Sequence, residues 1–101
     1  MTKTIRLGLN RGVNRIWLEG QWLAALGFTR GVRYVAVMDS ARAGTLAIVA
    51  GPDGTRVVSG KDTTPILDLT GSWLNPLVTE SRTLTLTCTC EGLLIITKGS
   101  E

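Results

Sequence analysis

Apolar and polar residues alternate in short runs along this chain, a pattern typical of β-strands with one buried face. In the first half, the pattern predicts strands at Thr4–Leu9, Arg15–Glu19, Val32–Met38 and Thr45–Ala50. Between the second and third of these strands, Trp22, Leu23 and Leu26 recur at helical spacing. Residues 21–26 are therefore expected to form one short helix.

The second half repeats this order after the turn-forming sequence Gly51–Gly54. The expected elements are strands at Thr55–Ser59, Pro65–Leu69, Thr83–Cys90 and Gly92–Thr97, with a short helix at Ser72–Leu77. The chain is thus predicted to be mainly β, with one short helix in each half.

The two halves align with each other at an offset of 51 residues. Residues 15–28, RIWLEGQWLAALGF, align with residues 66–79, ILDLTGSWLNPLVT, and Gly20, Trp22 and Leu23 meet identical residues. The same offset places Val35 and Val37 on Leu86 and Cys88, and a contraction of four residues then places 45–50 on 92–97. We therefore expect a single domain over residues 1–101, built of two units at 4–50 and 55–97 that share one core.

The two long strands of the halves differ in their faces. In residues 83–90, TLTLTCTC, leucines and cysteines face one way and threonines the other. Its first-half counterpart is apolar on both faces, with Val32, Tyr34, Ala36 and Met38 opposite Val35 and Val37. Either this strand is covered on both sides, or the face with Tyr34 and Met38 is an outer surface offered to a partner.

Composition and charge indicate what kind of domain this is, where it is located and what partner it binds. Hydrophobic residues make up 44% of the 101, which is typical of a compact domain. Residues 1–12 lack the continuous apolar stretch of a signal peptide, and no segment is apolar enough to span a bilayer, so a cytoplasmic location without membrane contact is expected. Residues 1–50 carry a net charge of +5 and residues 51–101 a net charge of −2, which favours a polyanionic partner for the first half.

Catalytic chemistry has little support in the sequence. The chain has no histidine, the commonest general base, and its carboxylates form no evident acid pair. Cys88 and Cys90 supply at most half of a metal site and are expected to be reduced core residues. Gly60–Lys61 fails as a phosphate-binding loop because Asp62 stands where Ser or Thr is needed. We expect a protein that is not an enzyme and has no cofactor.

Candidate binding residues gather on the first predicted hairpin. Arg6, Asn10, Arg11 and Arg15 would form a basic edge that contacts phosphates, and Arg30 and Arg33 would extend it. Strand alternation places Trp17 outward beside Arg15, where it contacts a base or a protein pocket or lies under a neighbouring hairpin. The same cations and Trp17 are also compatible with a solvated surface of no specific role.

The run from Arg15 to Leu18, the segment LEGQWLAALGF at residues 18–28, and Gly31 resemble SymE-like proteins, small bacterial toxin-type proteins with the AbrB-like swapped-hairpin fold. The likeness is close over residues 4–50 and weak over 55–97, where Asp68 replaces Trp17 and Ile66 replaces Arg15. It implies that the two units interleave their hairpins into a β-barrel-like pseudo-dimer within one chain. It also implies DNA binding by basic residues of the first strands.

Two functions remain open on these grounds. The first is non-enzymatic binding of nucleic acid, DNA in preference to RNA, by Arg6, Asn10, Arg11, Arg15, Arg30 and Arg33. The second is a small phage-type inhibitor or adaptor that binds an acidic host protein through Trp17, Tyr34 and Met38. A toxin with nuclease activity lacks visible catalytic groups, and two chains pairing as a homodimer would supply a second binding face.

Overall fold

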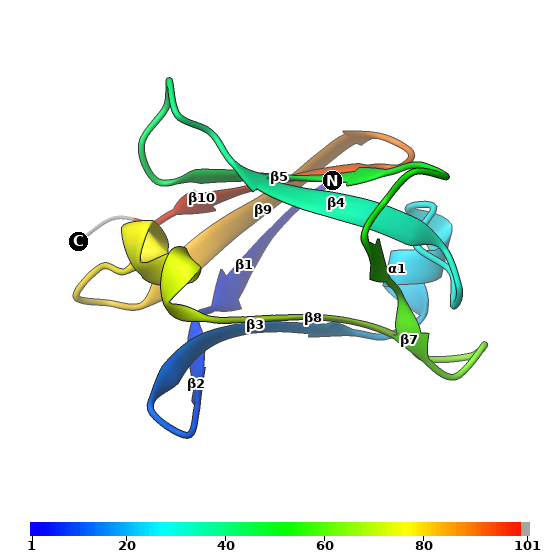
Figure 1. Ribbon diagram of the computed structural model, residues 1–101, viewed down its shortest axis with the longest axis horizontal. Coiled ribbons are helices and arrows are strands. Elements are labelled where there is room, and N and C mark those ends of the chain that lie inside the picture. The colour runs from blue at the N-terminus through cyan, green and yellow to red at the C-terminus, as the bar shows by residue number, and fades with distance from the viewer. Residues whose placement is uncertain (100–101) are drawn as a thin grey trace.

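The computed structural model describes residues 1–99, which form two antiparallel sheets stacked on one core (Figure 1). The first sheet has six strands in the order β1 (Thr2–Arg6), β9 (Thr83–Cys90), β10 (Leu93–Lys98), β5 (Thr45–Ala50), β4 (Arg33–Met38) and β6 (Arg56–Val57). The second has four strands in the order β2 (Gly8–Asn10), β3 (Val13–Glu19), β8 (Pro65–Thr70) and β7 (Ser59–Gly60). The protein is mainly β as predicted, but the sheets stay separate and open where a β-barrel-like body was expected.

Two short helices lie at opposite ends of the space between the sheets (Figure 1). Helix α1 spans Gln21–Ala25, and the 3₁₀ helix η1 spans Ser72–Leu77. Pro76 lies inside η1, where its missing N–H donor disfavours a regular α-helix. No helix within residues 1–99 has the length and apolar character needed to cross a membrane.

Two buried residues carry the chain from one sheet to the other. The sequence predicted continuous strands at Thr4–Leu9 and Thr55–Ser59, and both predictions are wrong, because Leu7 separates β1 from β2 and Val58 separates β6 from β7. Each side chain is only 1% exposed and lies in the core. Their backbone N–H groups donate to Arg82 O and Val32 O, both at 2.9 Å, so the crossings are satisfied without a continuous strand.

At the centre of the four-stranded sheet, β3 pairs with β8 symmetrically about the one pair that aligns at the offset of 51. Trp17 lies opposite Asp68, while Ile16 pairs with Leu69 and Leu18 with Leu67. The apolar four are buried. The strand pairing is therefore reciprocal between the halves at this point.

The turns into the two helices follow the same plan. Gly20 and Gly71 have φ angles of 135° and 148°, a region that favours glycine. The indole N–H of Trp22 donates to Glu19 O at 3.0 Å, and that of Trp73 donates to Thr70 O at 3.2 Å. Both tryptophans, predicted to be core residues, pack against the core while remaining partly exposed.

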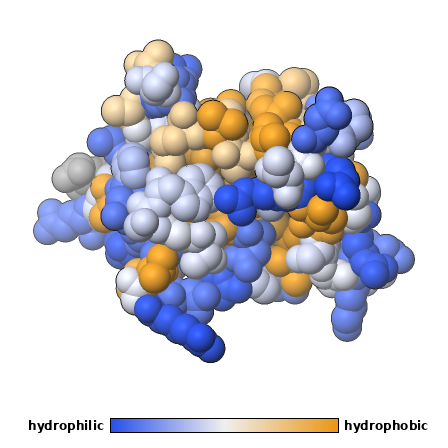
Figure 2. Space-filling model, viewed as in Figure 1, coloured by the Kyte–Doolittle hydropathy of each residue, from blue (hydrophilic) through white to orange (hydrophobic). Residues whose placement is uncertain are grey.

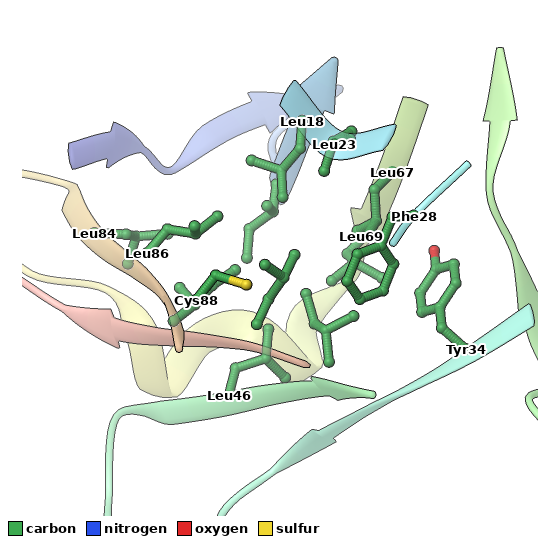
Figure 3. Close-up of a cluster of buried hydrophobic side chains, with 14 of the residues drawn as sticks. Leu18, Leu23, Phe28, Tyr34, Leu46, Leu67, Leu69, Leu84, Leu86 and Cys88 are labelled. Carbon is green, nitrogen blue, oxygen red and sulfur yellow. The ribbon is translucent and has the colours of Figure 1, made fainter. Parts of the chain in front are cut away.

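Tyr34 lies in the core, which corrects its expected place on an outer face. It is 2% exposed, and its ring meets that of Phe28 edge to face at a centroid distance of 6.4 Å (Figure 3). Met38 is on the same side of β4 and packs against the core, whereas Val37 is 54% exposed on the opposite side. The faces of β4 are thus the reverse of those predicted.

A one-residue slip in the internal alignment explains this reversal. Tyr34 pairs with Ala50 on β5, and Leu84 pairs with Lys98 on β10. The strand partners and the buried residues match when Tyr34 is placed on Leu84 and Ala50 on Lys98, at offsets of 50 and 48, whereas the sequence alignment used 51 and 47. Since side chains alternate along a strand, a slip of one residue moves every side chain to the other face.

Candidate nucleic-acid interface

The β2–β3 hairpin projects beyond the body of the four-stranded sheet (Figure 1). Asn10 pairs with Val13, and Arg11 and Gly12 between them have φ angles of 54° and 81°, as a two-residue type I′ turn requires. All three residues of β2 are exposed, and Leu9 is 61% exposed. The tip of this hairpin, residues 8–13, is thus an exposed two-stranded ribbon.

The hairpin is positively charged. Residues 1–18 contain Lys3, Arg6, Arg11 and Arg15 and no acidic residue. Within the described part of the chain, Arg11 forms no salt bridge, and it lies at the tip of the ribbon. A side chain placed there is free to reach a phosphate or a base edge.

Arg15 lies on the outer face of β3 but is bound to Asp68. Its Nε donates to Asp68 Oδ1 at 2.9 Å and its Nη2 to Asp68 Oδ2 at 3.1 Å, so the contact is bidentate. The hydrogen bond to Asp68 raises the pKa of Arg15, with the attraction between the two charges adding to it and desolvation opposing it. The positive charge of Arg15 is therefore compensated within the protein.

Trp17 lies outward beside Arg15, as predicted from strand alternation. It is 45% exposed, and the Arg15 guanidinium carbon lies 4.2 Å from the centroid of its ring. Its indole N–H donates to Glu19 Oε1 at 3.2 Å. The stacked arginine and this hydrogen bond hold one ring orientation at the centre of the face.

The other predicted cations lie elsewhere. Ile5 and Leu7 face the core, so Arg6 between them points to the outer face of the six-stranded sheet. Arg30 is near Asp62, with 3.7 Å between Nη1 and Oδ1, and Arg33 Nη1 donates to Gly54 O at 3.4 Å.

Arg30 and Arg33 belong to the end of the molecule near β7, the edge strand opposite β2. Gly31 N donates to Val58 O at 2.9 Å there. Of the six predicted nucleic-acid-binding residues, the structure brings only Asn10, Arg11 and Arg15 together on one hairpin.

Arg82 supports this hairpin and was missed by the sequence reasoning. Its Nε donates to Leu7 O at 3.1 Å, and its Nη2 donates to Gly8 O at 3.2 Å and to Asn14 Oδ1 at 2.6 Å. Its φ of 55° is unusual for a residue other than glycine. The available signal was its alignment with Gly31 at the offset of 51, which indicates a position that needs positive φ.

Two of the predicted partner-binding residues are not on the surface expected of them. Tyr34 is buried and Met38 packs against the core, so Trp17 alone of the three is an exposed aromatic residue. Val13, 38% exposed, lies on the same face of β3 as Trp17, whereas Leu9, 61% exposed, pairs with Asn14 and lies on the other face of the hairpin.

Cysteine and acidic residues form no recognisable reactive centre in the described chain. Cys88 is buried and Cys90, expected in the core, is exposed near the end of β9, and both are free thiols. Among residues 1–99, no group of three or more His, Cys, Asp or Glu side chains is placed to hold a metal ion.

Comparison with protein-family models, with curated proteins and with solved structures gives no match to this chain.

Proposed function

We propose that the protein binds duplex DNA by inserting the β2–β3 hairpin into the major groove. The observation that carries this proposal is the tip of the hairpin, residues 8–13, which is exposed throughout, has Asn10 and Arg11 at its turn and contains no acidic residue. Because none of its residues is buried in the core, the tip of the hairpin adds little to the stability of the fold. Its exposure is explained if it enters a partner.

The dimensions and the side chains fit this role. The major groove of B-DNA, about 12 Å wide, admits a two-stranded β-ribbon. Arginine pairs with guanine and asparagine with adenine through two hydrogen bonds each, so Arg11 and Asn10 are suited to base edges. The major groove of RNA helices is too narrow for side chains to read, which favours DNA over RNA.

Charges around the base of the hairpin would hold the backbone of the duplex. Arg6 precedes the ribbon and Arg82 braces Leu7 and Gly8 at its base. Both add positive charge beside the phosphates that flank a groove. Arg15 is expected to contribute less, because Asp68 already satisfies it.

We also infer that the chain is an internal pseudo-dimer of the AbrB-like swapped-hairpin type, related to SymE-like proteins. The crossings at Leu7 and Val58 and the reciprocal pairing around Trp17 and Asp68 support this inference. In that arrangement the β7–β8 hairpin is the counterpart of the β2–β3 hairpin. It carries Lys61 and Asp62 where the first has Asn10 and Arg11, so only one hairpin is suited to DNA.

Fluorescence anisotropy of a labelled duplex tests the proposal with a matched pair of variants. Arg11→Ala is expected to weaken binding by about tenfold or more, the loss of one good contact to a base edge. Lys61→Ala removes the same charge from the equivalent hairpin and is expected to leave the affinity within about twofold of the wild type. Equal effects of the two variants would reject hairpin insertion.

A second candidate function is capture of an acidic protein, which the exposure of Trp17 and Val13 on one face of β3 favours. Tryptophan and arginine are enriched at the centres of protein interfaces, and Trp17 and Arg15 are stacked here. If the wild-type protein binds no duplex at about 50 mM salt, where phosphate contacts are strong, this candidate replaces the first.

A further inference from the structure

The outer face of the six-stranded sheet is divided into a polar and an apolar half. Threonines cover it on β1 and β9, at Thr2, Thr4, Thr83, Thr85 and Thr87. Aliphatic side chains cover it on the other four strands, at Val35, Val37, Ala47, Val49, Val57, Leu93 and Ile95. Hydrophobic side chains gather along the upper side of the view in Figure 2, over this sheet.

A single row across the sheet shows the change. Thr2 lies beside Thr87, which lies beside Ile95, then Ala47 and then Val37. Val37 is 54% exposed, Val49 41% and Val57 48%. A contiguous group of half-exposed aliphatic residues on one sheet is typical of an interaction surface.

The strand β4 has opposite charges at the two ends of this apolar face. Arg33, Val35 and Val37 occupy every second position of β4 and so lie together on its outer side. Asp39 continues that side, because its N–H donates to Thr45 O at 2.8 Å in extension of the β4–β5 pairing. Asp39 Oδ1 accepts hydrogen bonds from the N–H groups of Ala41 at 2.8 Å and Arg42 at 3.3 Å, which fixes the carboxylate in place.

This order of charge, apolar residue, apolar residue and opposite charge is complementary to itself. When two copies of β4 face each other in opposite directions about a twofold axis at Ala36, Arg33 of one copy meets Asp39 of the other, and Val35 meets Val37. A twofold interface repeats each contact, so the pair of Arg33 and Asp39 occurs twice. Two sheets that pack face to face lie about 10 Å apart, a distance that arginine side chains can span.

We propose that the apolar half of this face binds a second copy of the chain, giving a twofold dimer through β4. The face lies on the six-stranded sheet, while the DNA-binding hairpin belongs to the other sheet. The dimer therefore leaves both hairpins free and goes beyond the proposed DNA binding.

Sedimentation velocity of the full chain, without DNA and over a concentration series, tests this inference. The wild type is expected to shift from monomer to dimer below about 1 mM, and Val37→Lys is expected to raise the dimer Kd at least about 100-fold because the change occurs twice in the interface. Thr87→Lys is the matched control in the same row on the polar half, and is expected to dimerise like the wild type. A wild type that stays monomeric, or a Val37→Lys variant that dimerises as well as Thr87→Lys, would overturn the inference.

A charge exchange identifies the geometry without altering the apolar face. Arg33→Asp and Asp39→Arg each bring like charges together twice and are expected to weaken the dimer about tenfold or more. The double variant Arg33→Asp/Asp39→Arg restores opposite pairs and is expected to recover most of the loss. No recovery in the double variant would contradict the twofold axis at Ala36, and circular dichroism of each variant verifies the fold.

The test is independent of DNA binding. Arg11→Ala is expected to dimerise as the wild type does, and Val37→Lys is expected to keep the affinity of one chain for a short duplex. Loss of dimerisation in Arg11→Ala would contradict the assignment of the interface to the six-stranded sheet.

Discussion

The guanidinium of Arg15 and the carboxylate of Asp68 form a bidentate salt bridge across β3 and β8, at 2.9 and 3.1 Å. Asp68 is also the residue opposite Trp17, whose ring Arg15 covers. Thr70 Oγ1 lies 3.3 Å from Asp68 Oδ1 and adds a further hydrogen bond. The centre of this face is thus held by interactions between the two halves of the chain.

Removing the charge of Asp68 should increase affinity for DNA. In Asp68→Asn, Arg15 keeps a neutral neighbour but is no longer compensated, so it becomes available to a phosphate. We expect the affinity for a duplex to rise severalfold and the slope of log affinity against log salt to steepen by about one. Anisotropy over a salt series measures both quantities, and Arg15→Ala/Asp68→Asn should cancel the gain. An unchanged slope in Asp68→Asn would show that Arg15 lies away from the DNA.

The two leucines that anchor the short helices should contribute similar stability. Leu23 and Leu74 are both 0% exposed and align at the offset of 51. Truncation of either to alanine leaves a cavity in the shared core and should lower the free energy of unfolding by about 2–5 kcal/mol. Chemical denaturation measures the loss, with Trp17→Ala, expected to cost less than about 1 kcal/mol, as the exposed control. A loss of stability in only one leucine variant would contradict a core shared by both halves.

Gly54 is required at the junction between the halves. It is buried, and a Cβ atom built there would collide with the backbone N, C and O atoms of Tyr34. Gly54→Ala should therefore lower the free energy of unfolding by about 1–3 kcal/mol. A Cβ on Gly51 meets no atom within 4 Å, so Gly51→Ala should change stability by less than about 0.5 kcal/mol. Thermal unfolding compares the pair, and equal stability of the two variants would contradict the close approach of Gly54 to β4.

The only tyrosine of the chain provides a test of the corrected face of β4. Burial raises the pKa of Tyr34 above its ordinary value of 10.0, while the charge of Arg56 lowers it in part. At pH values below about 10, both folded and unfolded states keep the proton, and Tyr34 has no effect on the pH dependence of stability. As the pH rises above that value, the unfolded state loses its proton first, so the free energy of unfolding falls until the pH passes the folded pKa.

Absorbance of tyrosinate during alkaline titration of the folded protein gives this pKa directly. The midpoint should lie above 10.0, and Arg56→Ala should raise it further. Tyr34→Phe removes the signal and serves as the blank. A midpoint at or below the ordinary value would place Tyr34 on the exposed face and contradict the packing described here.

Strand positions were largely predictable because alternation is encoded locally. The crossings were not, because Leu7 faces a core shared by both sheets and so keeps the apolar alternation from Ile5 onward. Leu9 continues that alternation, yet it is 61% exposed because the hairpin extends beyond the core. Local pattern cannot tell where the chain changes sheet.

The faces of β4 were ambiguous for a related reason. Because β4 has valines on one side and Tyr34, Ala36 and Met38 on the other, alternation does not specify which side faces the core. The register of β4 with β5 determines that side. The contacts of the candidate site were likewise not predictable from the local pattern. Arg15 and Trp17 were correctly expected to point outward together, but the salt bridge to Asp68 depends on pairing between residues 53 apart in sequence.

The most direct test of the central claim is a nuclear magnetic resonance titration of the isotope-labelled protein with a short DNA duplex. The account predicts that the largest amide shift changes fall on residues 8–13, at the tip of the β2–β3 hairpin, with smaller changes near Arg6 and Arg82 and almost none at the β7–β8 hairpin. Shift changes centred on the β7–β8 hairpin or on the outer face of β4, or none at about 50 mM salt, would contradict hairpin insertion into DNA.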